Sequence, residues 1–384
     1  MNQFRALAPI VDELERSQVS TVLLPTSHNF AKECQRWDQF PAVMIDNRAT
    51  ALLAFVLMPA LLVRGFFAFL SRDIRLARKA LTFYETMWAV PRVLFWGILV
   101  DVLQIKGVLV ANDHSPNFVT LVRAARIMGV PSFYVQHAHV TKKFPPLATD
   151  YAFLDGELAA ICYDYKPSKF TKVLLTGSPR LSPLVGLRQQ QRQALGIGLS
   201  LGDSVDNLRH LVDSAVEAGF RVVVRTHPAT SAREIDKLLR WTEGHPLLTL
   251  SEGHIEKVEN FLSRIHVLIA GDTSLHLEAF LAGCFTFYYK LRADLRADYY
   301  GFCESGICLE LTSEEQLTEA LNGFSRAPLM AGSKVCASLG TTFEKHPERV
   351  IVDVIRNSLN GREPNGWVRD TRFQNEVYSR AGNL

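Results

Sequence analysis

The sequence predicts an α/β fold of two consecutive domains, and three observations lead to this expectation. The chain has 384 residues, which favours two domains that each have their own core. Short runs of β-branched and leucine residues alternate with helical patterns, as in βαβ units with a parallel sheet. The alternation stops at a polar stretch, residues 186–194, and then restarts. We therefore expect one Rossmann-like domain over residues 1–185, a second over 186–350, and a C-terminal helix and tail over 351–384.

Each expected strand is a short apolar run that ends in a polar or turn residue. In the first domain these runs are residues 19–24, 42–45, 108–110, 132–135, 151–154 and 173–175. In the second domain they are residues 197–201, 221–224, 247–250, 267–270 and 285–288. Helical patterns are clearest over residues 116–128 and 206–218. Ligands of open α/β sheets bind beyond the carboxyl ends of the strands, so polar residues there are candidate site residues.

Composition narrows the function classes. Hydrophobic residues make up 48% and charged residues 21% of the chain, which is typical of a globular protein. The formal net charge of +3 is too small to indicate nucleic acid as a partner. The six cysteines form no CxxC pair and no set with zinc spacing, and the first residues lack the layout of a secretory signal. We therefore expect reduced thiols and a cytoplasmic protein.

Residues 49–104 interrupt the α/β pattern with an apolar, helical insert. Its uncharged run, residues 51–63, has 13 residues, fewer than the ~20 needed to span a bilayer. Basic residues follow closely: Arg64, Arg72, Arg75, Arg78 and Lys79. This combination favours a helix lying in the interface of an anionic membrane, with the inner-membrane surface as partner. The alternative is a buried helix pair whose basic face is solvated.

Two motifs of the second domain suggest a phosphate site. Arg225 and Thr226 precede the His227-Pro228 dipeptide at a strand end, where the ring could donate a hydrogen bond to a phosphate or simply cap loop carbonyls. The sequence from Gly271 through Asp272, Thr273 and Ser274 opens a helix, whose free amides and hydroxyls can bind an anion or serve only as an N-cap.

Polar residues also end the expected strands of the first domain. They are Asn112 and Asp113, then Gln136 and His137, then Asp155 and Glu157. A carboxylate and an imidazole at neighbouring strand ends are suited to acid–base or nucleophilic chemistry, although Asp113 could be an ordinary N-cap. At residues 176–180, Ser178 and Arg180 could contact the donor or form a turn between the domains.

Motifs of other enzyme classes are missing. The sequence has no nucleophile elbow, Walker loop or HExxH motif, and the Gly-rich residues 196–202 do not make a dinucleotide fingerprint. We therefore expect no metal and no cofactor apart from a nucleotide-sugar substrate.

The motifs together resemble those of GT-B glycosyltransferases that use cytidine nucleotides. In that group an HP motif and a downstream Ser/Thr motif hold the donor, and His227-Pro228 and Thr273-Ser274 are similar in order and separation. The group includes bacterial polysialyltransferases, CDP-glycerol glycerophosphotransferases and retaining β-Kdo transferases. Residues 112–116, 136–137 and 144–147 most resemble the β-Kdo transferases, and Asp155-Gly156 is similar to the acidic-glycine motif of GT-B sialyltransferases.

The resemblance covers roughly residues 105–290 and implies a GT-B fold, in which the two domains face each other across a cleft. It implies a transferase of capsule or O-antigen synthesis that moves a sugar from a CMP-linked donor, Kdo first and sialic acid second, to a saccharide or lipid-linked acceptor. Asp113 would be the catalytic nucleophile and His137 its partner, with Asp155 and Glu157 in reserve. The resemblance also implies that the second-domain motifs bind the donor.

Three alternatives remain open at this point. The chain could be a CDP-glycerol phosphotransferase, which transfers a polyol phosphate rather than a sugar. It could be a catalytically silent scaffold of a polysaccharide assembly complex. A UDP-sugar epimerase shares the fold, but the pairing of the HP and serine motifs favours a cytidine donor.

Overall fold

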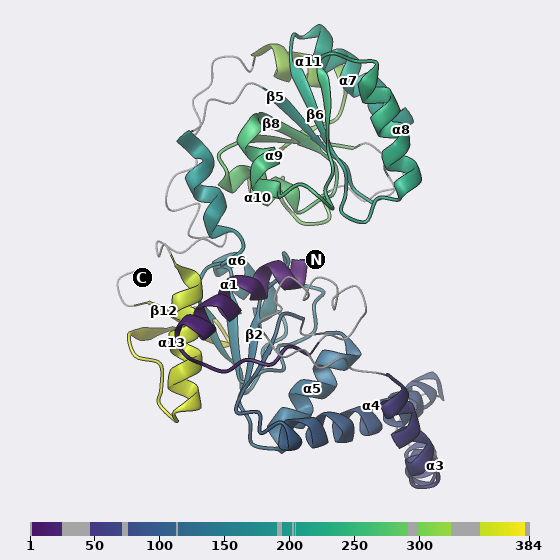
Figure 1. Ribbon diagram of the computed structural model, residues 1–384, viewed down its shortest axis with the longest axis vertical. Helices are drawn as coiled ribbons and strands as arrows, with labels where there is room; N and C mark the ends of the chain where they lie inside the picture. Colours follow the sequence, from purple (N-terminus) through teal and green to yellow (C-terminus); the bar gives the residue numbers. More distant parts are fainter. Residues whose placement is uncertain are drawn as a thin grey trace. The chain divides into compact units, whose positions relative to one another are not determined.

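In the computed structural model, the chain divides into two compact units (Figure 1). The structure describes residues 2–24, 47–70, 76–112, 114–189, 194–201, 203, 205–290, 298–323 and 346–380. Unit 1 consists of Met1–Arg180 together with Glu344–Leu384, and unit 2 is Leu181–Phe343. Each unit is built on a six-stranded sheet, so the predicted two-domain α/β fold is confirmed.

The sheet of unit 1 has the strand order β1-β2-β3-β4-β12-β11. Its first four strands are parallel: β1 (Val108–Val110), β2 (Ser132–Val135), β3 (Tyr151–Leu154) and β4 (Lys172–Leu175). Strand β12 (Glu376–Arg380) is parallel to β4, and β11 (Trp367–Asp370) pairs with β12 in antiparallel fashion. The tail set apart in the sequence analysis therefore completes the sheet of unit 1.

Helices cover both faces of this sheet because alternate strand residues point to opposite sides. Tyr134 and Leu154 pack in a core with α4 (Leu76–Val102), α5 (Pro116–Ile127) and α6 (Glu157–Asp164). Phe133 and Phe153 pack in a second core with α1 (Asn2–Arg16) and α13 (Pro347–Leu359).

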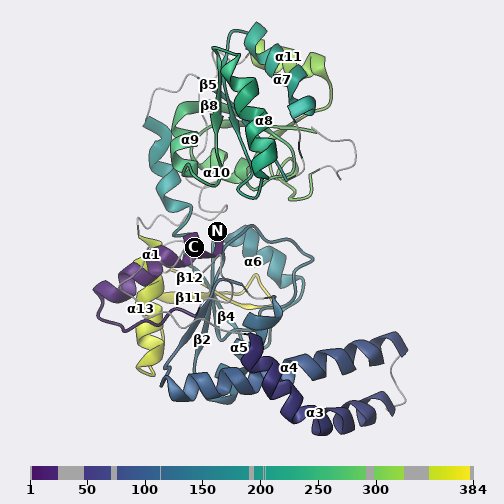
Figure 2. The ribbon, with the colours of Figure 1, turned by 45° about the vertical axis from the view of Figure 1, so that its right-hand side comes forward.

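The apolar insert is helical, as predicted. Helix α3 (Asn47–Leu70) packs against α4, and the two form the hairpin that Figure 2 shows. Trp96 and Val100, near the end of α4, are buried in the core of unit 1 and anchor the hairpin there. Within the described residues, no helix combines the length and the apolar character that a membrane span requires.

The sheet of unit 2 is entirely parallel, with the order β10-β9-β8-β5-β6-β7. Its strands are β5 (Ala194–Gly198), β6 (Arg221–Arg225), β7 (Leu248–Ser251), β8 (Ile265–Ala270), β9 (Phe285–Tyr289) and β10 (Leu309–Leu311). The accompanying helices are η2 (Ser182–Gln189), α7 (Val205–Glu217), α8 (Ala232–Glu243), α9 (Val258–Arg264), α10 (Leu275–Leu281) and α11 (Glu314–Gly323). The chain moves from β5 outward to β7 and returns to β8 on the other side of β5, so its direction switches between β5 and β8.

Two expected strands differ from the structure. Residues 19–24 contain only an isolated bridge at Leu23, and none of the six is buried, so they lack the apolar environment of the central strands. The strand expected at residues 197–201 is β5, which lies three residues earlier. A Cβ on Gly196 would come within 2.8 Å of Phe261 in α9, and one on Gly198 would come within 2.7 Å of Leu275 in α10. The glycines of β5 therefore permit close packing of these two helices rather than ending the strand. Residues 42–45 lie outside the described residues.

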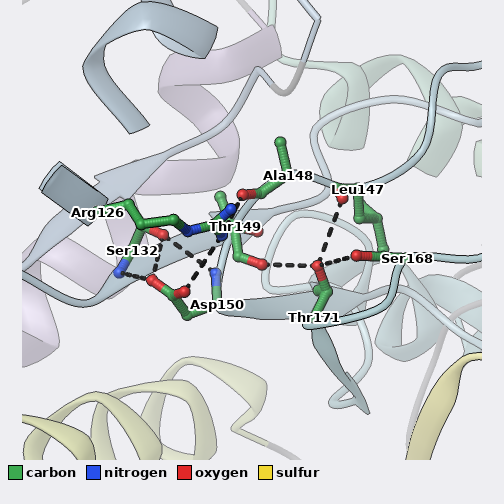
Figure 3. Close-up of polar contacts among 8 residues, drawn as sticks. All are labelled: Arg126, Ser132, Leu147, Ala148, Thr149, Asp150, Ser168 and Thr171. Carbon is green, nitrogen blue, oxygen red and sulfur yellow. Dashed lines mark hydrogen bonds and ion pairs between the residues drawn. The ribbon is translucent and has the colours of Figure 1, made fainter. Parts of the chain in front are cut away.

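A polar network fixes the amino ends of β2, β3 and β4 (Figure 3). The Asp150 carboxylate accepts hydrogen bonds from the backbone N–H of Ser132 at 2.9 Å and from its hydroxyl at 2.6 Å, and it pairs with Arg126 at 3.3 Å. The Thr171 hydroxyl donates to the Thr149 carbonyl at 2.7 Å. These contacts hold the connection between β2 and β3 where it enters β3. This edge of the sheet is opposite the carboxyl ends of the strands, which carry the predicted site residues.

Candidate functional site

The site in unit 1 begins at the carboxyl end of β1. The side-chain oxygen of buried Asn112 accepts hydrogen bonds from the backbone N–H groups of His114 at 3.1 Å and Ser115 at 2.8 Å. Asn112 thus shapes the turn that leads into α5. Asp113, the predicted nucleophile, lies outside the described residues.

Gln136 connects the ends of β2 and β3. Its side chain is buried, its amide nitrogen donates to the Ala138 carbonyl at 3.0 Å, and its amide oxygen accepts from the Asp155 N–H at 2.9 Å. Gln136 was predicted to bind substrate, and these bonds show that its side chain also joins the ends of the two strands. His137 follows it and is partly buried at the same end of the sheet.

Asp155 is the most unusual carboxyl group of unit 1. Its residue is only 6% exposed, and burial raises the pKa of the carboxyl group to about 7, against the opposing effects of the Arg180 charge and the nearby Ser178 hydroxyl. The loop after β4 therefore lies beside Asp155. The predicted residues Ser178 and Arg180 are thus close to this catalytic candidate. A carboxyl group with a pKa near 7 can exchange a proton at neutral pH.

Glu157, the other reserve carboxylate, lies in the first turn of α6 and is paired with an arginine that the sequence did not indicate. Arg372 contacts Glu157 at 2.8 Å and Asp370 at 2.6 Å. Hydrogen bonds from Arg372 lower the pKa of Asp370. Arg372 comes from the C-terminal hairpin, far away in the sequence, and no local pattern links it to Glu157.

In unit 2, the end of β6 is fixed by buried polar contacts. The Arg225 guanidinium donates to the Ser251 hydroxyl at 2.8 Å and to the Glu256 carbonyl at 3.0 Å, so this predicted ligand residue holds neighbouring loops together. The Thr226 hydroxyl accepts from the Gly253 N–H at 2.9 Å. A Cβ at position 253 would lie 2.2 Å from the Thr226 carbonyl oxygen, so this close approach requires glycine.

The His227-Pro228 turn presents a neutral imidazole. The His227 carbonyl accepts from the Thr230 N–H at 2.9 Å, which closes a turn with Pro228 at its second position. The Nδ1 atom of His227 accepts from the Ala229 N–H at 3.1 Å, and burial lowers the pKa of the ring. The proton of the neutral ring therefore sits on Nε2, which is a hydrogen-bond donor.

The end of β8 turns into helix α10. The Thr273 hydroxyl accepts from the Leu275 N–H at 3.3 Å, and Ser274 stands at the N-cap position without a side-chain cap. Ser200, just beyond β5, donates from its hydroxyl to the Asp272 carbonyl at 3.0 Å. The ends of β5 and β8 are therefore joined directly at the switch point of the sheet, where α/β proteins commonly bind ligands.

Asp272 and His276 brace this turn. The Asp272 carboxylate accepts from the Tyr299 N–H at 2.8 Å and the Tyr288 hydroxyl at 3.2 Å. Burial raises the pKa of Tyr288 to about 12, so the hydroxyl stays protonated. Buried His276 places Nε2 3.0 Å from the Gly271 carbonyl, and burial lowers its pKa to about 4. The sequence analysis did not identify His276, Tyr288 or Ser200, because their contacts cross between elements.

In the described part of the chain, no three His, Cys, Asp or Glu side chains gather as a metal site would require.

Comparisons with known proteins find similarity in fold. No family model and no curated protein sequence matches this chain. Among solved structures, it is similar to UDP-GlcNAc 2-epimerase from Methanocaldococcus jannaschii, with a TM-score of 0.57 and 12% identity over 93% of this chain and 97% of that one.

Two further structures come from Neisseria meningitidis and Acinetobacter baumannii. UDP-GlcNAc 2-epimerase from Neisseria meningitidis, bound to UDP-GlcNAc, gives a TM-score of 0.55 and 10% identity over 94% of this chain and 97% of that one. MurG from Acinetobacter baumannii gives a TM-score of 0.52 and 14% identity over 92% of this chain and 95% of that one. At these identities the similarity establishes the GT-B class of fold.

Proposed function

We propose that the protein is a glycosyltransferase of bacterial surface-polysaccharide synthesis that transfers Kdo from a CMP-linked donor to a saccharide or lipid-linked acceptor. Two observations support the proposal: unit 1 holds a buried carboxyl group with a pKa of about 7 at a strand end, and unit 2 holds the His227 ring at the end of β6, the strand beside β5. Proteins of this fold that act on nucleotide sugars are among the solved structures similar to it. The proposed location is the cytoplasmic face of the inner membrane, where lipid-linked acceptors lie.

Unit 2 would bind the donor phosphate. The Nε2–H of His227 is a donor at neutral pH, and the backbone at Thr273 and Ser274 begins helix α10. Strands β6 and β8 both neighbour β5, so these two groups flank one strand end within the same unit. Together they supply hydrogen bonds to an anion without a metal.

Unit 1 would supply the acid–base chemistry. Asp155, half-ionised near neutral pH, can accept the acceptor proton and return it, and His137 is the second proton carrier. Asp113, which follows Asn112 in the sequence, remains the proposed nucleophile of a retaining transfer.

A UDP-sugar 2-epimerase is the second candidate, and the solved epimerase structures of the same fold favour it. The chemistry also fits, because inverting a carbon that bears hydrogen requires groups that remove a proton from one face of the sugar and return one to the other face. The two candidates differ in the nucleotide they would bind and in the product they would release.

A donor panel distinguishes the candidates. The protein is incubated separately with CMP-Kdo, CMP-sialic acid, CDP-glycerol and UDP-GlcNAc, and both nucleotide release and sugar configuration are followed. Acceptor-dependent CMP release from CMP-Kdo alone supports the proposal. Release from CDP-glycerol would indicate a glycerophosphotransferase, and a configuration change in UDP-GlcNAc would indicate an epimerase. Absence of turnover and of nucleotide binding with all four donors would support a non-catalytic scaffold.

A further inference from the structure

Among the side chains of helix α3 that the structure describes, most of the apolar ones are exposed. Phe55 is 73% exposed and Val56 is 66% exposed, although both are large apolar residues in the middle of the helix. The other large apolar residues that α3 exposes are Leu52, Met58, Leu62, Val63 and Phe66. Single exposed apolar residues are normal on protein surfaces, whereas a continuous set of this size marks an interaction surface.

The hairpin leaves this surface uncovered by the described part of unit 1. Among the described side chains of α3, the partly buried apolar ones are Leu53, Ala54 and Leu57, and Leu53 and Leu57 lie about one helical turn apart. Helix α4 packs against α3. Helix α4 in turn exposes Trp88 and Ile98, at 42% and 57%. We call the exposed apolar residues of α3 the α3 surface.

The charged residues in the sequence that contains the α3 surface indicate what kind of partner binds it. Residues 47–84 contain a single acidic residue, Asp73, against the basic residues Arg48, Arg64, Arg72, Arg75, Arg78 and Lys79. Arg92 lies 5.8 Å from the centre of the Trp88 ring, a pairing of cation and aromatic ring common where a protein meets lipid headgroups. A second copy of the chain would bring the same positive charges together, so the charge favours an anionic partner.

We infer that the α3 surface lies in the headgroup–acyl boundary of a bilayer that contains anionic phospholipid. The exposed apolar side chains enter the boundary, and the basic residues on either side of them contact lipid phosphates. A helix of 24 residues extends about 36 Å, so α3 lying flat offers a long contact line. This inference rests on the membrane location proposed above, but it does not depend on the identity of the sugar donor.

Vesicle flotation tests the inference with the full chain. The vesicles consist of phosphatidylcholine alone or with about a third phosphatidylglycerol, at low and high salt. We expect wild-type protein to float with the anionic vesicles and to lose part of this binding at high salt, because exposed charges are screened beyond a Debye length of about 10 Å at 0.1 M ionic strength. Changing Arg72, Arg75, Arg78 and Lys79 to Gln should weaken the binding at least a hundredfold, since each basic residue contributes roughly fivefold.

A matched pair of variants separates apolar insertion from charge. Phe55→Asn, Val56→Asn and Val63→Asn together should abolish flotation without affecting folding, because these side chains are exposed. Ile127→Asn, Ile255→Asn and Leu309→Asn change equally exposed residues elsewhere and should float like wild type.

Equal flotation of the two triple variants would overturn the inference. Failure of the wild-type protein to float with anionic vesicles would overturn it as well. If wild type instead forms dimers that the first variant loses, a second copy covers the surface and the lipid assignment is wrong. Nucleotide binding measured on the same samples shows whether the donor site is intact, so failure of the lipid inference is distinguishable from failure of the proposed function.

Discussion

The side-chain oxygen of Gln136 accepts a hydrogen bond from the backbone N–H of Asp155 at 2.9 Å. This bond joins the ends of β2 and β3 and fixes where the chain leaves the sheet at Asp155. The carboxyl group of Asp155 is consequently held in a buried position beside Ser178 and Arg180. Gln136, which the sequence analysis predicted to bind substrate, thus positions Asp155, whose carboxyl group holds a titratable proton.

The first prediction concerns stability against pH. The pKa of Asp155 is about 7 in the folded protein and 3.8 in its unperturbed state, so its contribution to stability is present below pH 4 and is lost as pH rises through 7. Between pH 5 and pH 8 this loss amounts to about 3 kcal/mol. Asp155→Asn should remove that part of the pH dependence, as measured by urea unfolding at both pH values. Asp101→Asn, which changes an exposed carboxylate of the same unit, should retain the wild-type dependence.

The second prediction separates the two catalytic candidates. Asp155→Asn should slow transfer by about 100-fold or more and remove the limb of the pH–rate profile near pH 7, because the proton carrier is lost. Asp113→Ala should cost several orders of magnitude in rate while donor binding survives, as expected for a nucleophile. Intact-mass analysis with donor but no acceptor would detect a covalent sugar. If Asp113→Ala keeps more than about a tenth of the activity, Asp113 is not the catalytic carboxylate.

The third prediction concerns the donor phosphate. His227→Ala removes the Nε2–H donor and should weaken nucleotide binding by about 1–3 kcal/mol, measured by calorimetry. Donor affinity should change little between pH 7 and pH 8, because burial lowers the pKa of His227 and the ring is already neutral. His254→Ala, in the neighbouring loop, should bind nucleotide like wild type. Wild-type affinity in His227→Ala would reject the assignment.

The fourth prediction concerns the loop that supports His227. Gly253→Ala places a Cβ 2.2 Å from the Thr226 carbonyl oxygen, so the backbone must move. We expect a loss of about 2–4 kcal/mol in the free energy of unfolding of unit 2, together with weaker nucleotide binding. Gly244→Ala is the control, because its Cβ would meet only the Trp241 carbonyl at 3.8 Å. Similar stability of the two variants would show that the Thr226 loop is not closely held.

Local patterns in the sequence predicted the fold class and most central strands, but not that the C-terminal strands β11 and β12 complete the sheet of unit 1. The alternation of apolar runs and helical patterns predicted strands such as β1, β2, β3 and β9 at or near their observed bounds, because burial on both faces leaves a continuous apolar run. Strand β5 was placed too late, because its glycines lie inside the strand, where they permit close packing of α9 and α10.

The sequence by itself determined which polar residues end the strands, since chain order and hydrophobicity fix where each strand stops. Only the tertiary structure decided what those residues do. Gln136 and Arg225 are satisfied by partners on other strands, Glu157 is paired with Arg372, and Asp155 is buried among groups from β2 and the loop after β4. These outcomes depend on which segments the sheet order brings together and on how far each side chain is shielded from water. Neither can be predicted from the local sequence.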